Sequence, residues 1–362
     1  MNFDLSEEQK MLAEQANALL ADRSPFDHLR GLIDSGAEWD EPLWRELAEM
    51  GFLGAAIPEA YGGLGLSALD LGVLATEFGR TNAAVPFFSS IVLAAEAILM
   101  AGNEEQKAEW LPKLASGEIV ATLAYSEGPG TPAPAGVAFA GDRVTGVKTP
   151  VADAGIADIA LVLTDAGLVI VRLDAPGVAR TKLDAFDHLR AHYRLEFSDA
   201  PGELLARPID MQALFDRAAV QAAFEATGAA EACLVMARDY ALERQMFGRS
   251  LASYQAIKHK LADIAVQVEL VRSNAYFAGW AAGESAGELP AAAAAARLTA
   301  ISAFEAAARE NLQVHGGIGY TQEANCHFFY RRERLLAVHI GNRDYWAARL
   351  IQHIPASQAE AA

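Results

Sequence analysis

The sequence predicts an α+β protein of several domains: an N-terminal helical domain, a middle antiparallel β-barrel or sandwich, and a C-terminal four-helix bundle. Two observations predict this order. Apolar residues recur at helical intervals up to about residue 117 and again from about 210 to 352. Between them lie short β-prone runs broken by Gly, Pro and Asp. We therefore expect domains at residues 1–117, 118–208 and 209–362.

Local signals mark the elements of each region. Ser6 and Gln9 have the spacing of a capping box, which predicts a helix start. "EPLWRELAEMGFLG" and "LDLGVLATEFGR" repeat the helical pattern, and a further short helix should end near Gly117. The middle region contains the expected strands "EIVATLAYSE", "VAFAGDRVTGVKTPV", "IADIALVLTDAGLVIVRL" and "HYRLEFSDA". Three long helices rich in alanine follow.

Composition excludes several classes of function. The chain has 362 residues, of which 52% are hydrophobic, so it can bury large cores. Its net charge of −18 disfavours binding to nucleic acid. Cys233 and Cys326 are the two cysteines and form no CxxC, so neither a disulfide framework nor a cysteine-rich metal site is indicated. The acidic N-terminus is no signal peptide and Arg297 interrupts the longest apolar tract, so we expect no membrane insertion and a soluble, cytoplasmic protein.

The segment "NLQVHGGIGYTQE" places three glycines at the end of a helical pattern. One glycine would be enough to end a helix. Three of them beside Gln313 favour a ligand group that approaches the backbone, because a Cβ would block it. No GxGxxG stands between a strand and a helix and no GxxxxGK[ST] is present, so ordinary Rossmann and P-loop sites are excluded.

Three segments resemble the acyl-CoA dehydrogenase family and follow one another in the family's order, and the resemblance as a whole extends over nearly the entire chain. "YALERQMFGRSLASYQAIKHKLADI" and "QVHGGIGYTQE" resemble its signature segments, and "IPEAYGGLGLSALDLGVLATEFGR" resembles its N-terminal domain. The resemblance implies FAD bound at a subunit interface, a CoA thioester as substrate and an electron-transferring flavoprotein as electron acceptor.

The resemblance also implies contacts to the adenosine-diphosphate half of FAD. An Arg guanidinium suits the pyrophosphate because it is a permanent fork of donors, and glycines let the backbone approach it. The matching positions are Arg244, Phe247 and Gln255 for the first contact, and Gln313, Gly316 and Gly317 for the second.

Around the flavin ring the chain departs from the family pattern. Ser126 and Glu127 keep the family's Thr-Glu positions, and Ser126 is a candidate FAD contact, but the Gly-Ser-Asp that follows is absent. Lys148 is kept, whereas Pro150 stands where the family has Trp. Because proline offers neither an indole ring nor an N–H, either the isoalloxazine is held differently or this chain has lost its own flavin-ring site.

The family's general base is missing from both of its usual positions. Ile340 occupies the position of the Glu in the family's Glu-Gly-Thr, and Ala218 and Ala219 occupy the alternative Glu-Arg positions. The nearest acidic–basic pair is Asp216–Arg217, offset by two residues. Asp216 is therefore a candidate base and Arg217 a candidate substrate contact, although Asp216 could instead cap the helix that starts near it.

Three hypotheses follow. The C-terminal "HFFYRRER" resembles the tail of family members that form one half of a heteromeric dehydrogenase in bacterial steroid side-chain degradation. The preferred hypothesis is thus FAD-dependent conversion of an acyl-CoA to a 2-enoyl-CoA by a hetero-oligomer whose partner supplies the base. The alternatives are a self-sufficient homo-oligomer with Asp216 as base, and a catalytically inactive subunit that binds the adenine end of FAD.

Overall fold

The computed structural model describes residues 5–128 and 136–353, which form two compact units. The first unit comprises Met1–Phe26, Ala68–Ala83 and Ala219–Ala362, and the second comprises Asp27–Ser67 and Ala84–Ala218. The sequence-based division into three domains at 117 and 208 stays a prediction.

The first unit is helical. The predicted start of its first helix is confirmed: the Ser6 hydroxyl accepts the Gln9 N–H at 3.2 Å, and the Gln9 side chain accepts the Ser6 N–H at 3.0 Å. Its helices are α1 (Glu7–Arg23), α4 (Ala68–Thr81), most of α7 (Met211–Glu243), α8 (Gln255–Glu284), α9 (Leu289–His315), η5 (Gly316–Tyr320), α10 (Cys326–Leu336) and α11 (Arg343–His353).

Glycines allow α4 and α7 to pack backbone against backbone. A Cβ added at Gly79 would lie 1.9 Å from the Glu225 carbonyl oxygen, and one added at Gly228 would lie 1.9 Å from that of Thr76. No side chain fits at such distances, so any substitution at either glycine would push the two helices apart.

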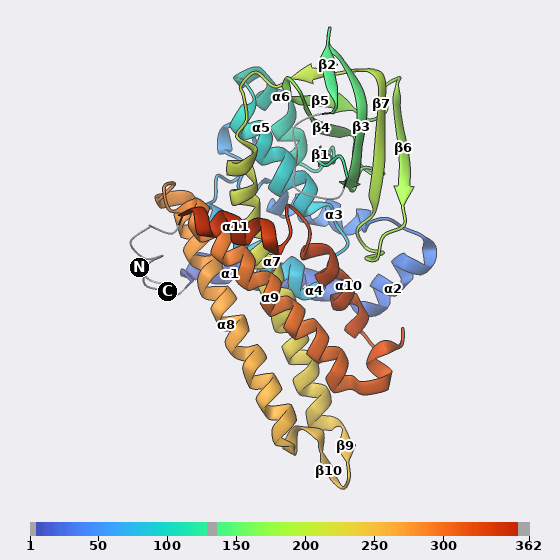
Figure 1. The fold of residues 1–362 in the computed structure, drawn as a ribbon, viewed down its shortest axis with the longest axis vertical. Coiled ribbons are helices and arrows are strands. Elements are labelled where there is room, and N and C mark those ends of the chain that lie inside the picture. Colours follow the sequence, from blue (N-terminus) through green and yellow to red (C-terminus); the bar gives the residue numbers. More distant parts are fainter. Residues whose placement is uncertain (1–4, 129–135, 354–362) are drawn as a thin grey trace. The chain divides into compact units, whose positions relative to one another are not determined.

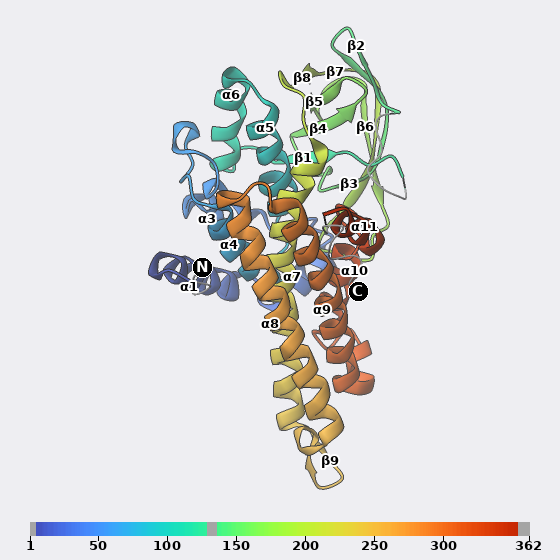
Figure 2. The same ribbon diagram turned by 60° about the vertical axis from the view of Figure 1, so that its left-hand side comes forward.

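The long helices α7, α8 and α9 lie side by side in both views of the ribbon (Figures 1 and 2). A short hairpin of β9 (Gln245–Met246) and β10 (Arg249–Ser250), followed by η4 (Leu251–Ser253), joins the end of α7 to the start of α8. Gly248 has φ +78° and Phe247 has φ +51°, which gives the chain a tight turn at the tip.

The second unit combines short helices with two four-stranded sheets. The strand orders are β1-β4-β5-β8 and β2-β3-β7-β6. The strands are β1 (Ala121–Ala124), β2 (Ala138–Ala140), β3 (Arg143–Ala152), β4 (Ile159–Thr164), β5 (Gly167–Arg172), β6 (Val178–Leu183), β7 (His192–Pro201) and β8 (Glu203–Leu204). The helices are α2 (Phe26–Ser35), α3 (Glu41–Glu49), η1 (Phe52–Gly54), η2 (Glu59–Tyr61), the π-helix η3 (Phe88–Ala95), α5 (Glu96–Ala101) and α6 (Glu104–Ala115).

The predicted helix–strand–helix order is confirmed, with two corrections to the β region. Of the two predicted forms, barrel and sandwich, the barrel was wrong: the strands of the described residues form two separate sheets that do not close. In addition, β1 pairs with β4 in parallel, because the chain enters the other sheet as β2 and β3 before it returns as β4. The prediction of an entirely antiparallel region was therefore wrong for this pair.

Candidate functional site

The first group of predicted FAD contacts lies on the hairpin between α7 and α8. Arg244 follows the last turn of α7, where its backbone N–H donates to the Tyr240 carbonyl at 2.9 Å, and its carbonyl accepts the Leu251 N–H at 2.7 Å. Arg244 and Gln255 are exposed, and Phe247 is 91% exposed. An aromatic side chain so open to water favours a contact with a ligand or another chain.

The second group lies at the end of α9. Gly316 has φ 64° and ψ −140°, a backbone conformation that belongs almost only to glycine. A Cβ added at Gly316 or Gly317 would meet nothing within 4 Å, so packing within the chain does not explain the glycines. The Gln313 side chain is exposed beside them. This open stretch of backbone could receive a ligand group.

The structure brings the two groups together. Val314 packs in a buried cluster with Ala237 and Ala241 of α7. The rings of Tyr240 and His315 stack, with their centroids 4.1 Å apart and their planes at 26°. The end of α7 that carries Arg244 therefore contacts the end of α9 that carries Gln313, although the two lie some seventy residues apart in the sequence.

These ends fit the adenosine-diphosphate half of FAD chemically. They offer an exposed guanidinium, an exposed side-chain amide and an open backbone at two glycines. A pyrophosphate needs hydrogen-bond donors, positive charge and close approach of the backbone. The residues thus fit the adenosine-diphosphate half of FAD, which the resemblance implies for them. We call the six residues together the adenine-end cradle: Arg244, Phe247, Gln255, Gln313, Gly316 and Gly317.

The residues expected at the flavin ring lie in the second unit. The Ser126 hydroxyl donates to the Gly128 carbonyl at 3.0 Å, and the Thr149 N–H donates to the Ser126 carbonyl at 2.8 Å. Lys148 is fully buried and its Nζ lies 2.6 Å from Glu127 Oε1. Burial lowers the pKa of Lys148, and the Glu127 carboxylate opposes that shift. These polar groups are thus engaged within the chain. The lost Gly-Ser-Asp positions fall in the stretch that includes residues 129–135, which lies outside the described residues.

Neither of the usual base positions holds a proton acceptor. Ile340 is fully buried at φ +53°, a conformation rare for a β-branched residue, and it is followed by Gly341. Ala218 and Ala219 are fully buried in α7.

The candidate pair Asp216–Arg217 lies inside α7. The idea that Asp216 caps this helix is wrong: α7 begins at Met211, and Asp210 Oδ1 accepts the N–H of Gln212 at 2.9 Å. Asp216 is one turn further on and only 2% exposed. Arg217 Nε lies 3.4 Å from Glu96 Oε1 of α5, so the candidate substrate contact already faces a carboxylate.

Sequence reasoning missed Glu96 because a single carboxylate within the apolar run "VLAAEAIL" carries no motif. Burial raises the pKa of Glu96, and Arg217 opposes the shift. Sequence reasoning also missed Glu225 in α7, which forms a buried ion pair with Arg332 of α10 at 3.4 Å. Only the fold reveals these pairs.

Glu333 provides a prediction for stability. Burial raises the pKa of this carboxyl from 4.5 to about 7, and Arg334, whose Nε is 2.7 Å away, opposes the shift. Because the folded-state pKa exceeds the unfolded one, stability is lost as pH rises from about 4.5 to about 7. We expect Glu333→Gln to raise the free energy of unfolding at pH 8 by about 1–3 kcal/mol and to leave it unchanged near pH 4. Urea titrations at both pH values check this, and an equal effect at both would contradict it.

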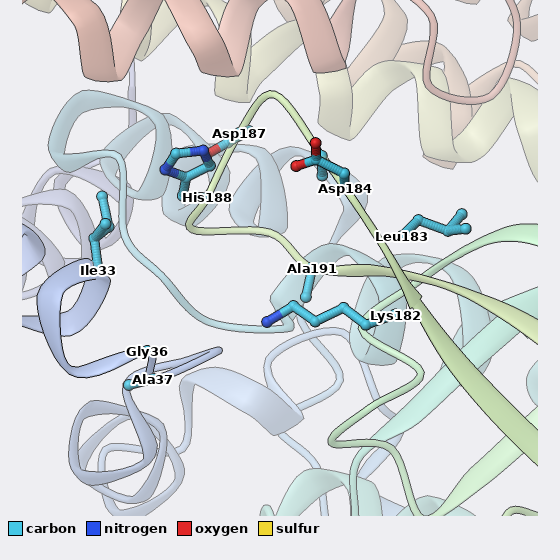
Figure 3. A pocket seen from close by; sticks show the side chains of 10 residues that line it. Ile33, Gly36, Ala37, Lys182, Leu183, Asp184, Asp187, His188 and Ala191 are labelled. Carbon is cyan, nitrogen blue, oxygen red and sulfur yellow. The ribbon is translucent and has the colours of Figure 1, made fainter.

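A cavity of about 200 Å³ in the second unit carries mixed charges (Figure 3). Lys182 extends along it, and its Nζ lies 2.9 Å from Glu38 Oε1. Asp184, Asp187 and His188 also line it. Since the lysine is paired and the other formal charges are negative, the cavity does not favour an anionic group such as a CoA phosphate, and we assign it no ligand.

Two further observations concern the described residues. None of the helices within 5–128 and 136–353 is long and apolar enough to cross a membrane. Within the same ranges, no group of three or more His, Cys, Asp or Glu side chains could hold a metal ion.

We expect Arg244→Ala to weaken FAD binding about ten- to a hundredfold, because it removes a charge-assisted hydrogen bond worth roughly 1.5–3 kcal/mol. Flavin fluorescence titration of the flavin-free protein, alone and with a partner chain, measures this. Arg238→Ala is a matched control, since Arg238 is an exposed arginine of α7 that pairs with Asp239. Equal affinity of both variants would make Arg244 an ordinary surface charge.

Comparison with known proteins identifies the family. Residues 6–118 match "Acyl-CoA dehydrogenase, N-terminal domain", and residues 208–354 match "Acyl-CoA dehydrogenase, C-terminal domain". The acyl-CoA dehydrogenase IpdE2 of Mycobacterium tuberculosis is 32% identical over 90% of this chain and 91% of its own. The acyl-CoA dehydrogenase FadE27 of the same organism is 31% identical over 91% of this chain and 92% of its own.

Solved structures agree with this assignment. A variant of the Tcur3481-Tcur3483 steroid ACAD has a TM-score of 0.89 at 31% identity, covering 98% of this chain and 99% of its own. A chain of the ChsE4-ChsE5 complex from M. tuberculosis has a TM-score of 0.90 at 27% identity, and the match covers 98% of this chain and 100% of the other. The chain therefore belongs to the acyl-CoA dehydrogenase family of FAD-dependent oxidoreductases.

Proposed function

We propose that this chain takes part in the α,β-dehydrogenation of a CoA thioester as one subunit of a hetero-oligomer whose partner supplies the catalytic base. The observation that carries the proposal is the buried Ile340 at the base position, together with Ala218 and Ala219 at the alternative one. An alkyl side chain cannot accept the α-proton, so a carboxylate must come from elsewhere. Two of the similar structures are named for two chains each, the Tcur3481-Tcur3483 steroid ACAD and the ChsE4-ChsE5 complex.

Exposed apolar side chains near the adenine-end cradle support a partner. Six large apolar side chains of α7, the hairpin and α8 are exposed to solvent. A second subunit of the same family would cover them and bring its own flavin-ring residues to the adenine-end cradle. The six residues are Val235, Leu242, Met246, Phe247, Val266 and Leu270.

In this proposal the present chain binds part of FAD and the partner carries out the proton transfer. Arg244, Gln313 and the backbone at Gly316 and Gly317 hold the adenosine-diphosphate half of FAD by charge and hydrogen bonds. When bound, FAD supplies the acceptor for the hydride that leaves the β-carbon. The partner's carboxylate takes the α-proton. An electron-transferring flavoprotein then removes the electrons, as the family resemblance implies, and the steroid relative makes a steroidal acyl group the first substrate class to test.

The proposal is tested by producing the chain alone and together with a family member from the same genome that has Glu in its Glu-Gly-Thr segment. We expect the two chains to copurify, and bound FAD and acyl-CoA oxidation to need both. A chain that is yellow and active alone would overturn the proposal in favour of a homo-oligomer. A complex in which variants of this chain change FAD content but never turnover would favour the inactive-subunit alternative.

A further inference from the structure

We propose that Tyr240 and His315 are positioning residues that hold the two halves of the adenine-end cradle in register. This inference rests on the proposed role of the cradle in FAD binding. Both residues lie within the two signature segments, but the resemblance assigns neither of them a contact to FAD. Their stacked rings are one of the contacts that join the end of α7 to the end of α9, beside the buried cluster of Ala237, Ala241 and Val314.

The orientation of His315 is fixed by its own helix. His315 Nδ1 lies 2.8 Å from the Asn311 carbonyl oxygen, one turn earlier in α9. A carbonyl only accepts hydrogen bonds, so Nδ1 is the protonated nitrogen and donates. This bond holds one edge of the ring, and the stack against Tyr240 holds one face. Burial also lowers the pKa of His315, against the opposing effect of its hydrogen bond to Asn311.

Each ring is connected directly to a cradle residue. The Tyr240 carbonyl accepts the Arg244 N–H at 2.9 Å, so a shift of Tyr240 shifts the backbone that carries the guanidinium. His315 precedes Gly316, whose φ of 64° turns the chain out of the helix. The turn then folds back on His315, because a Cβ added at Gly319 would lie 2.9 Å from His315 Cβ. Loosening the stack therefore frees both halves of the cradle.

The competing interpretation is that the rings only fill space. Tyr240 and His315 are each only partly buried, while the fully buried contact between α7 and α9 is made by Ala237, Ala241 and Val314. Ring removal should therefore leave the alanine–valine contact in place. Removal of either ring should therefore change the relative position of the two helix ends that face the ligand more than it changes the stability of the fold.

The test is a set of FAD dissociation constants for the flavin-free assembly, measured by quenching of flavin fluorescence, for Tyr240→Ala, His315→Ala and the double variant. We expect each single change to weaken FAD binding about three- to tenfold, the range such an aromatic pair is worth. The double variant should bind FAD about as tightly as the single variant with the lower affinity, because both changes remove the same stack. Tyr240→Phe keeps the ring and should stay within about twofold of the natural protein.

Phe277→Ala is the matched control, since Phe277 packs against Trp280 on α8 with ring centroids 5.7 Å apart. It lies 22 residues beyond Gln255 and thus about 30 Å along the helix from the hairpin. We expect it to lower the melting temperature without changing FAD affinity. Unchanged affinity in both alanine variants, or additive losses in the double variant, would overturn the inference. If Arg244→Ala also leaves affinity unchanged, the FAD role itself fails; if Arg244→Ala alone weakens binding, only this inference fails.

Discussion

Arg332→Met is expected to lower the free energy of unfolding by about 3–5 kcal/mol, the cost of breaking a buried ion pair by removing one partner. Arg332 Nη1 lies 3.4 Å from Glu225 Oε1, and the two side chains are 0% and 4% exposed. Methionine fills a similar volume but leaves the Glu225 carboxylate buried without this cation. Denaturant titration of the natural and variant chains measures the difference.

Two controls separate this charge effect from packing. Arg238→Met removes an exposed cation of α7, whose side chain is 55% exposed beside Asp239, and should cost less than about 1 kcal/mol. The double variant Arg332→Met, Glu225→Gln should recover part of the lost stability, because it also removes the uncompensated charge. A loss from Arg332→Met no larger than that from Arg238→Met would show that the pair contributes little.

Replacing the base Glu of the partner chain by Gln is expected to slow acyl-CoA oxidation by the assembled enzyme about 10²–10⁴-fold, the usual contribution of a positioned general base. FAD content should not change, since the adenine-end cradle of this chain is untouched. Stopped-flow reduction of bound flavin by substrate measures the chemical step directly. A loss of less than about tenfold would mean that another group accepts the proton.

Features that depend on neighbouring residues could be predicted from the sequence. The capping box of Ser6 and Gln9 and the helix end near Gly117 depend on a few neighbouring residues, and the structure has both. The adenine-end cradle stays a prediction that rests on the resemblance, since Arg244 and Gly316 belong to short, specific segments.

Features that depend on distant residues could not be predicted. The parallel pairing of β1 with β4 is set by the path of the chain through the second sheet. Glu225 and Arg332 lie 107 residues apart, and nothing in either local segment indicates the other. Asp216 was a wrong candidate for the cap, because α7 begins at Met211 and Asp210 accepts the N–H groups of Gln212 and Ala213 at its start.

Asp216→Asn in the assembled enzyme tests most directly the claim that the partner supplies the base. In the sequence, Asp216 is the acidic residue nearest to an expected base position, two residues before Ala218. The change keeps the size of a side chain that is 2% exposed and removes its ability to accept a proton as a carboxylate. Flavin content and melting temperature should be recorded for the same samples to confirm that the variant is folded and loaded. If the partner supplies the base, the rate of flavin reduction by acyl-CoA stays within about a few-fold of normal. A loss of about a hundredfold or more with FAD still bound, the size expected for a missing general base, would contradict the account and make Asp216 the base of a self-sufficient enzyme.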